Sequence, residues 1–318
     1  MIFFHRFLAK ITYMIVLSHI SALEFWRFAA DGKSQYPEVK YAYSLITAPP
    51  SETTGTALFT RPLHILVADD SQRKRTNDLV SHTWIHPLKK GDVFDAGNGL
   101  YVISPELCFL SLAKTISLFS LIEIGYEMCG TYRRLKETHY NCQPLTTLKK
   151  LKECVEKASR FRGCKKALRA LRYVLDNSAS PMETNLTMLL CLPYQLGGYG
   201  IKQPILNPPI EAAYDRHLKC DLYWHDIKFA IEYESNEFHC GSEKITEDSI
   251  RRTNLNTLLV DVLTVTYVQV KNRGEFEKIA NILARKTSKK LRFNKSDFYR
   301  INSELRRVLF SQNREIHP

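Results

Sequence analysis

The sequence predicts an α+β protein with two mixed domains and a basic helical segment between them. The chain has 318 residues, of which 44% are hydrophobic and 25% are charged, a balance typical of globular proteins with buried cores. Short apolar runs typical of strands alternate with segments in which apolar residues recur at spacings of three and four. We expect a first domain over residues 1–143, a basic helical linker over 144–176 and a second domain over 177–318.

The first 18 residues predict a helix rather than a secretion signal or a membrane span. Their apolar runs are interrupted by His5, Arg6 and Lys10, so they lack both the clean apolar core of a signal peptide and the length of a spanning helix. Met14 is an alternative start. The eight cysteines contain no CxxC pair. We therefore expect a cytoplasmic protein with free thiols and no membrane partner.

The rest of the first domain predicts strands at "PLHILVAD" and "GLYVIS", followed by one helical pattern over residues 106–130. Ser104 and Pro105 form a typical helix start before that pattern. His64, His82 and His86 resemble a metal cluster only loosely. We interpret these histidines as strand and loop residues.

The segment "TLKKLKECVEKASRFRGCKKALRALRYVLD" predicts two short helices that break near Gly163. Between Lys149 and Arg172 it carries ten Lys and Arg residues against two Glu residues, a net charge of +8 out of +12 for the whole chain. Such a segment is either a solvated helical face or a phosphate-binding surface. The candidate nucleic-acid contacts are Lys165, Lys166, Arg169 and Arg172.

The second domain is predicted to open with a helix capped by Ser180, with Pro181 and Glu183 in its first turn. A loop rich in glycine and proline and a short strand follow, and the "GGYG" within this loop is a turn, because no phosphate-loop helix start follows it. Further helices are expected near residues 244–258 and 275–291, with a β-rich run, "VDVLTVTYVQV", between them.

The stretch "CDLYWHDIKFAIEYESNEFH" at residues 220–239 places the carboxylates Asp221, Asp226, Glu232 and Glu234 among strand-forming residues. The "HDIK" segment has hairpin spacing, so a strand ending near Trp224 should pair with one that starts at Phe229. Glu232 and Glu234 would then share one face, with Asp221 brought toward them across the hairpin. Like charges on one face destabilise a sheet, and Mg²⁺ or Mn²⁺ bound by these oxygens would offset the repulsion.

These residues resemble the active-site signature of the PD-(D/E)XK nuclease superfamily. In more detail, "CDLYW", "IEYESNEFH", "EDSIRR" and "VLTVTYVQV" resemble the very-short-patch-repair endonuclease domain over about 50 residues. The matching positions are Asp221, Trp224, Glu232, Glu234, His239, Asp248, Arg251, Thr266 and Gln269.

The resemblance implies a restriction-endonuclease-like core, with a mixed sheet flanked by helices and a metal ion held by Asp221, Glu232 and Glu234. It implies Glu183 as an additional acid, His239 as the group that assists at the scissile phosphate and Gln269 as a residue near the site. Arg251 and Arg252 would contact phosphate. One departure is that Glu234 stands where most members have Lys, a variation that some restriction enzymes of the superfamily share.

The N-terminal region resembles the central part of AbiEi-type antitoxin and regulator proteins over about 110 residues, on "SHISALEFWRF", "PLHILVADD" and the segment from Ser81 to Gly130. This resemblance implies a regulatory domain with a protein partner. The sequence therefore predicts a Mg²⁺-dependent DNA endonuclease or nickase in phage defence or DNA repair. The alternative is an inactive DNA-binding module of antitoxin type. The oligomeric state is left open.

Overall fold

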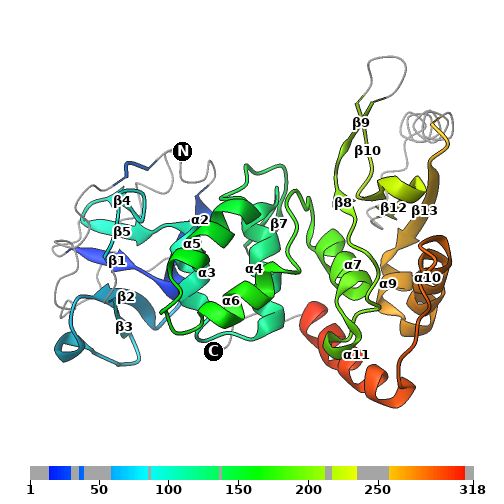
Figure 1. Cartoon of the computed structure of the whole chain (residues 1–318). Coiled ribbons are helices and arrows are strands. Elements are labelled where there is room, and N and C mark those ends of the chain that lie inside the picture. The colour runs from blue at the N-terminus through cyan, green and yellow to red at the C-terminus, as the bar shows by residue number, and fades with distance from the viewer. Residues whose placement is uncertain are drawn as a thin grey trace. The chain divides into compact units, whose positions relative to one another are not determined.

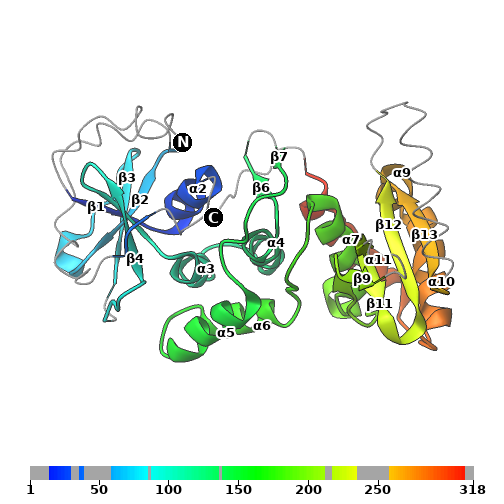
Figure 2. The same cartoon turned by 90° about the horizontal axis from the view of Figure 1, so that it is seen from above.

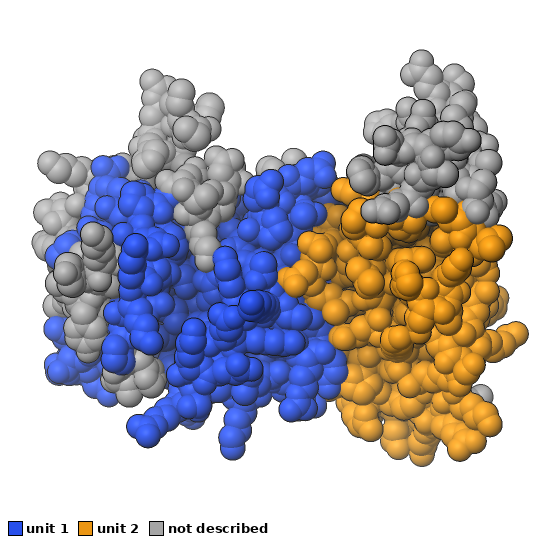
Figure 3. Space-filling view, turned by 45° about the horizontal axis from the view of Figure 1, so that its top comes forward, with its two compact units in different colours: residues 1–174, 316–318 blue, residues 175–315 orange. Residues whose placement is uncertain are grey.

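The computed structural model describes residues 14–29, 36–38, 59–84, 87–135, 138–211, 217–234 and 258–311. The chain divides into two compact units, one formed by residues 1–174 with 316–318 and one by residues 175–315 (Figure 3). The basic segment expected as a separate linker therefore belongs to the first unit. Among the described residues, no helix has the length and apolar character needed to cross a membrane.

The first unit contains a mixed five-stranded sheet in the order β3-β2-β1-β5-β4 (Figure 1). Its strands are β1 (Ile15–Leu17), β2 (Leu63–Val67), β3 (Leu79–Thr83), β4 (Val93–Gly97) and β5 (Leu100–Ile103). The β2–β3 and β1–β5 pairs are parallel, and the β1–β2 and β4–β5 pairs are antiparallel. The strands expected at "PLHILVAD" and "GLYVIS" are confirmed, whereas Ile15–Leu17 is a strand and not part of a first helix.

Helices α2 (His19–Phe28), α3 (Pro105–Leu112), α4 (Leu118–Cys129), α5 (Leu148–Lys157) and α6 (Cys164–Leu171) accompany this sheet, and a short β6–β7 ribbon (Arg133–Arg134 and Thr138–His139) follows α4. The single helix expected over residues 106–130 is two helices, because Ser117 Oγ accepts a hydrogen bond from Ser120 N at 3.1 Å and starts a new one. The predicted cap is confirmed, since Ser104 Oγ accepts a hydrogen bond from Leu107 N at 3.2 Å.

The basic segment folds as the two helices that its sequence predicts; both pack against α3 and against each other, and α6 also packs against α4. Gly163 separates them with a φ of 108°, in the left-handed region that favours glycine. A Cβ atom at this position would lie 3.0 Å from Lys114 N, so the turn also needs a residue without a side chain.

The second unit is built on a mixed four-stranded sheet in the order β13-β12-β11-β8, of which Figure 1 labels β8 and Figure 2 labels β11, β12 and β13. Its strands are β8 (Ile205–Leu206), β11 (Leu222–Trp224), β12 (Phe229–Glu234) and β13 (Asp261–Thr266), and a separate ribbon pairs β9 (Pro209–Glu211) with β10 (His217–Lys219). Strand β12 is antiparallel to β11 and parallel to β13. The predicted hairpin is confirmed, with Lys228 at a φ of 46° completing the turn.

The helices of the second unit are α7 (Pro181–Cys191), α9 (Tyr267–Lys271), α10 (Arg273–Lys286) and α11 (Lys295–Leu309). Helix α7 starts as predicted, because Ser180 Oγ accepts a hydrogen bond from Glu183 N at 3.1 Å. Two mixed sheets flanked by helices make the protein α+β, as the sequence indicates. The helix expected near residues 244–258 lies outside the described residues, apart from its last position.

The turn after α7 allows a test of packing in the second unit. A methyl group at Gly198 would lie 2.6 Å from Leu192 Cβ and closer still to the Leu192 carbonyl oxygen. We expect Gly198→Ala to lower the free energy of unfolding by about 1–3 kcal/mol, because backbone must move to admit the group.

Urea unfolding followed by circular dichroism measures this change. Gly274→Ala is the matched control, since a methyl there meets only Asn272 Oδ1 at 3.4 Å. That variant should be as stable as the original chain or more stable, because alanine favours helix α10 over glycine. Equal stability of Gly198→Ala and the original protein would contradict the close packing.

Candidate functional site

Asp221 and Glu232 lie side by side on neighbouring strands of the second unit. The β11–β12 register pairs Leu222 with Ile231, so the next position along each strand places Asp221 opposite Glu232. The Asp221 carboxylate accepts a hydrogen bond from Tyr233 N at 2.7 Å through Oδ2. The expected approach of Asp221 to the end of the strand that carries Glu232 and Glu234 is therefore present.

Glu183 joins this group from the first turn of α7. Its side chain is buried, and Oε2 accepts hydrogen bonds from Ala179 N at 2.8 Å and from Asn207 Nδ2 at 2.6 Å. Burial and the nearby charge of Asp221 raise the pKa of Glu183 to about 7. The two carboxylates are thus electrostatically coupled, and the site holds a proton on Glu183 at or below neutral pH.

Asn207 is the member of this site that the sequence interpretation missed. Its backbone N donates to Asp221 O at 3.1 Å, while its side-chain amide donates to Glu183. Asn207 has a φ of 47°, in the left-handed region that asparagine tolerates better than most residues. The "NPP" sequence at this turn is the only signal that could have pointed to it.

Glu232 and Glu234 differ in their surroundings although they share one strand face. Glu232 is half-buried, and its Oε1 atom lies below the surface, whereas Glu234 is exposed at the end of β12. Glu232 pairs with Thr264 and Glu234 with Thr266 on β13. The two glutamates therefore differ in their access to solvent.

The carboxylates are not gathered as tightly as three ligands of one ion. Among the described residues, the only group of three with ligand atoms within 4.8 Å of one another consists of histidines in the first unit. The carboxylates of the second unit nevertheless suit Mg²⁺ chemically, because all of their ligand atoms are oxygens. The repulsion between Glu183 and Asp221 is also the kind of strain that a bound cation relieves.

Gln269 lies on a helix and not on the strand that the sequence predicts. Strand β13 ends at Thr266, and Gln269 Oε1 accepts hydrogen bonds from Thr266 N at 2.9 Å and from Thr266 Oγ1 at 3.0 Å. This capping box starts α9 and ends the strand. Gln269 is therefore close to the end of β13 beside Glu234, with its side-chain oxygen used in a structural bond.

Of the residues singled out in the sequence, His86, His239, Asp248, Arg251 and Arg252 lie outside the described residues.

The candidate phosphate contacts of the basic segment fall in α6 and just after it. Lys165, Arg169 and Arg172 are exposed. Lys166 is half-buried, and its Nζ donates to Ile116 O at 2.8 Å. Lys166 therefore holds α6 against the turn before α4, whereas Lys165 and Arg169 extend from the helix surface, where a phosphate backbone could reach them.

Comparison of the chain with protein-family models, with curated proteins and with solved structures finds no match.

The buried Glu183 carboxylate predicts a pH-dependent effect of Glu183→Gln. A carboxyl with a pKa near 7 in the folded chain and near 4.5 when unfolded destabilises the fold increasingly as the pH rises from 4.5 to 7. Glutamine keeps an oxygen that accepts the bonds from Ala179 and Asn207 but carries no charge. The free energy of unfolding of Glu183→Gln, relative to that of the original chain, should therefore rise by roughly 3 kcal/mol between pH 4.5 and pH 8 without added metal ions.

Urea unfolding at a series of pH values measures this difference. Glu304→Gln is the control, because Glu304 is half-exposed and pairs with Arg300 at 3.1 Å on the helix surface. A constant difference between Glu183→Gln and the original chain across this range would show that the pKa of Glu183 is not raised.

Proposed function

We propose that the second unit hydrolyses phosphodiester bonds of DNA with Mg²⁺, or with Mn²⁺ in its place. The observation that carries the proposal is the pairing of Asp221 with Glu232 across two strands, next to a buried acid, Glu183, whose pKa is raised. Paired carboxylates at the end of a sheet are a common arrangement for metal-assisted phosphoryl chemistry.

The order of elements supports a restriction-endonuclease-like core. Helix α7 is followed by three antiparallel strands, β8, β11 and β12, and then by β13, which is parallel to β12. A parallel neighbour requires a crossover, which here falls in residues 235–260. The acidic residues stand on α7, before β11 and on β12, as the nuclease resemblance implies.

In this proposal Asp221, Glu232 and Glu234 hold the metal ion and orient the phosphate. When bound, the ion supplies activation of a water molecule and stabilisation of the leaving oxygen. Glu183 takes up or releases a proton near neutral pH, because its pKa is close to 7. His239 assists at the phosphate, and Arg251 and Arg252 contact the backbone. Exposed cations of α6 add sequence-independent affinity for DNA.

A second candidate function is DNA binding without cleavage, in an antitoxin-type regulator. Two observations favour it. Glu234, at the position where most nucleases of this type carry Lys, is exposed, and the carboxylates are not gathered around one point. A protein partner that binds the first unit and a role in phage defence or repair remain predictions.

Cleavage of supercoiled plasmid and of mismatched duplex, with Mg²⁺ or Mn²⁺, tests the nuclease. We expect Asp221→Asn to lower the rate by about 100-fold or more, because a neutral amide no longer stabilises the cation at the reacting phosphate. Asparagine keeps an oxygen that accepts the hydrogen bond from Tyr233 N, so the hairpin should remain folded.

The matched control is Asp226→Asn in the same hairpin, where the exposed carboxylate pairs with Lys202 at 2.7 Å. This variant should cut at the original rate. Cutting that survives a chelator or the Asp221→Asn change would contradict the mechanism. Retained DNA binding with no cutting by the original protein would favour the binding module.

The exposed cations of α6 predict a measurable salt dependence. The double variant Lys165→Ala with Arg169→Ala should lower the slope of log affinity against log salt by about 2, because each phosphate contact releases about one counterion. Fluorescence anisotropy with duplex DNA at several salt concentrations measures the slope. Lys278→Ala is the control, since Lys278 pairs with Glu275 at 2.7 Å on α10. An unchanged slope in the double variant would make this surface a solvated helical face.

A further inference from the structure

Three histidines from distant parts of the chain meet on one face of the sheet in the first unit. His64 lies in β2 and His82 in β3, and the parallel register pairs Leu66 with His82. His64 and Leu66 share a face of β2, so His64 and His82 are diagonal neighbours. His19 is the first residue of α2, directly after β1, the strand on the other side of β2.

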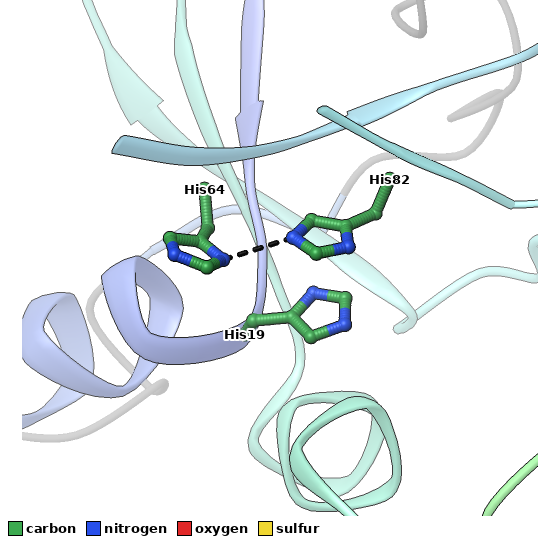
Figure 4. Close-up of side chains that lie close together, drawn as sticks. All are labelled: His19, His64 and His82. Atoms are coloured by element: carbon green, nitrogen blue, oxygen red, sulfur yellow. Dashed lines mark hydrogen bonds between the residues drawn. The ribbon is translucent and has the colours of Figure 1, made fainter. Parts of the chain in front are cut away.

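The imidazole rings are in direct contact (Figure 4). His64 Nδ1 and His82 Nε2 are 2.9 Å apart, and the rings of His19 and His82 stack with centroids 3.6 Å apart. Each of the three residues offers one ring nitrogen within 4.8 Å of the others. Tetrahedral zinc with three imidazole ligands needs nitrogen separations of roughly 3.4 Å. The nitrogens are thus close enough to share an ion, and the stacked rings of His19 and His82 must turn relative to each other so that a nitrogen of each points at it.

The surroundings keep the rings neutral, which is the form that binds metal ions. Burial, the repulsion that a proton on His64 would exert, and the charges of Lys114, Arg73 and Arg75 lower the pKa of His82 to about 3. Burial and Arg75 lower the pKa of His64, and burial, the two other imidazoles and Lys114 lower the pKa of His19. Two neutral rings can form the His64–His82 hydrogen bond only if one proton lies between the nitrogens.

The backbone also holds His19 in an unusual conformation toward the other rings. Its φ is 49°, in the left-handed region that residues other than glycine seldom adopt. His19 is 4% exposed, and its Nδ1 lies 3.1 Å from Ser18 Oγ, which orients the ring. Backbone strain of this kind, held by the surrounding structure, is common among residues of functional sites.

We propose that His19, His64 and His82 bind a zinc-class transition metal ion, with the fourth coordination position open. The ion takes the place of the proton between His64 Nδ1 and His82 Nε2, and that proton moves to the other nitrogen of the same ring. Imidazole nitrogens suit Zn²⁺, Ni²⁺ and Cu²⁺ and do not suit Mg²⁺. The nearby cations, Lys114, Arg73 and Arg75, favour an anion as the fourth ligand. This site lies in the first unit and goes beyond the proposed nuclease.

The test uses the full chain, freed of metal ions with a chelator, and titrated with Zn²⁺ by calorimetry. We expect one Zn²⁺ ion bound per chain at the histidines. His82→Gln and His19→Asn should each weaken this binding by roughly 100-fold or more, because each removes one ligand. Asparagine is chosen at position 19 because it tolerates the left-handed backbone, so the variant should fold, as circular dichroism can verify.

Two controls separate this site from other metal-binding groups. His225→Gln changes an exposed histidine of the second unit, and Asp221→Asn removes a carboxylate of the proposed nuclease site. Both variants should bind Zn²⁺ at the histidine site with unchanged affinity. Co²⁺ in place of Zn²⁺ should give a visible spectrum of tetrahedral nitrogen and oxygen ligation without a thiolate charge-transfer band, which excludes the cysteines.

Zn²⁺ binding that is equally strong in His19→Asn and His82→Gln would overturn the proposal, as would the absence of binding in the original chain. Loss of binding in Asp221→Asn alone would also overturn it and would assign the zinc to the second unit. Because the nuclease assay depends on Asp221 and this titration depends on the histidines, either proposal can fail without the other.

Discussion

The antiparallel register between β11 and β12 is the constraint on which the second unit depends. With Leu222 opposite Ile231, the buried side chains of Leu222, Trp224, Phe229 and Ile231 share one face, and Asp221 stands beside Glu232 on the other. A slip by one residue would turn Leu222 and Trp224 to the face of the carboxylates and move Asp221 away from Glu232. The same register lets the Asp221 carboxylate accept the Tyr233 backbone N–H at the end of the ladder. The site is therefore positioned by the packing of the sheet.

Electrostatic repulsion within this arrangement has two possible sources of relief. Glu183 is buried near Asp221, and its pKa is raised to about 7, so the free site binds a proton over a wide pH range. At higher pH a divalent cation would relieve the repulsion in place of the proton, because its charge neutralises both carboxylates. Asn207 supports either state, since its side chain donates to Glu183 while its backbone donates to the Asp221 carbonyl. This exchange between proton and cation links the burial of Glu183 near Asp221 to the proposed chemistry.

The two units offer metal ions different chemistry. The second unit presents carboxylate oxygens, which favour hard ions such as Mg²⁺, whereas the first presents three neutral imidazoles, which favour zinc-class ions. Burial removes charge in both cases, through opposite effects on protonation. It favours the protonated, neutral form of Glu183 and the deprotonated, neutral form of His82. Occupancy of one site therefore need not follow occupancy of the other.

Local patterns in the sequence by themselves determined the starts of α3 and α7, the break at Gly163 and the β11–β12 hairpin, because caps, glycine and strand alternation act over a few residues. The same reasoning failed at residues 106–130, where a second cap at Ser117 divides an apolar pattern that looks continuous, and at Gln269, where a capping box ends the strand. The nuclease resemblance implied Glu183 beside Asp221, whereas only the tertiary structure decided that Asn207 joins them and that His19 joins His64 and His82. The strand order β3-β2-β1 brings these histidines together although they are far apart in the sequence. A local sequence pattern cannot predict this, because strand pairing joins distant segments.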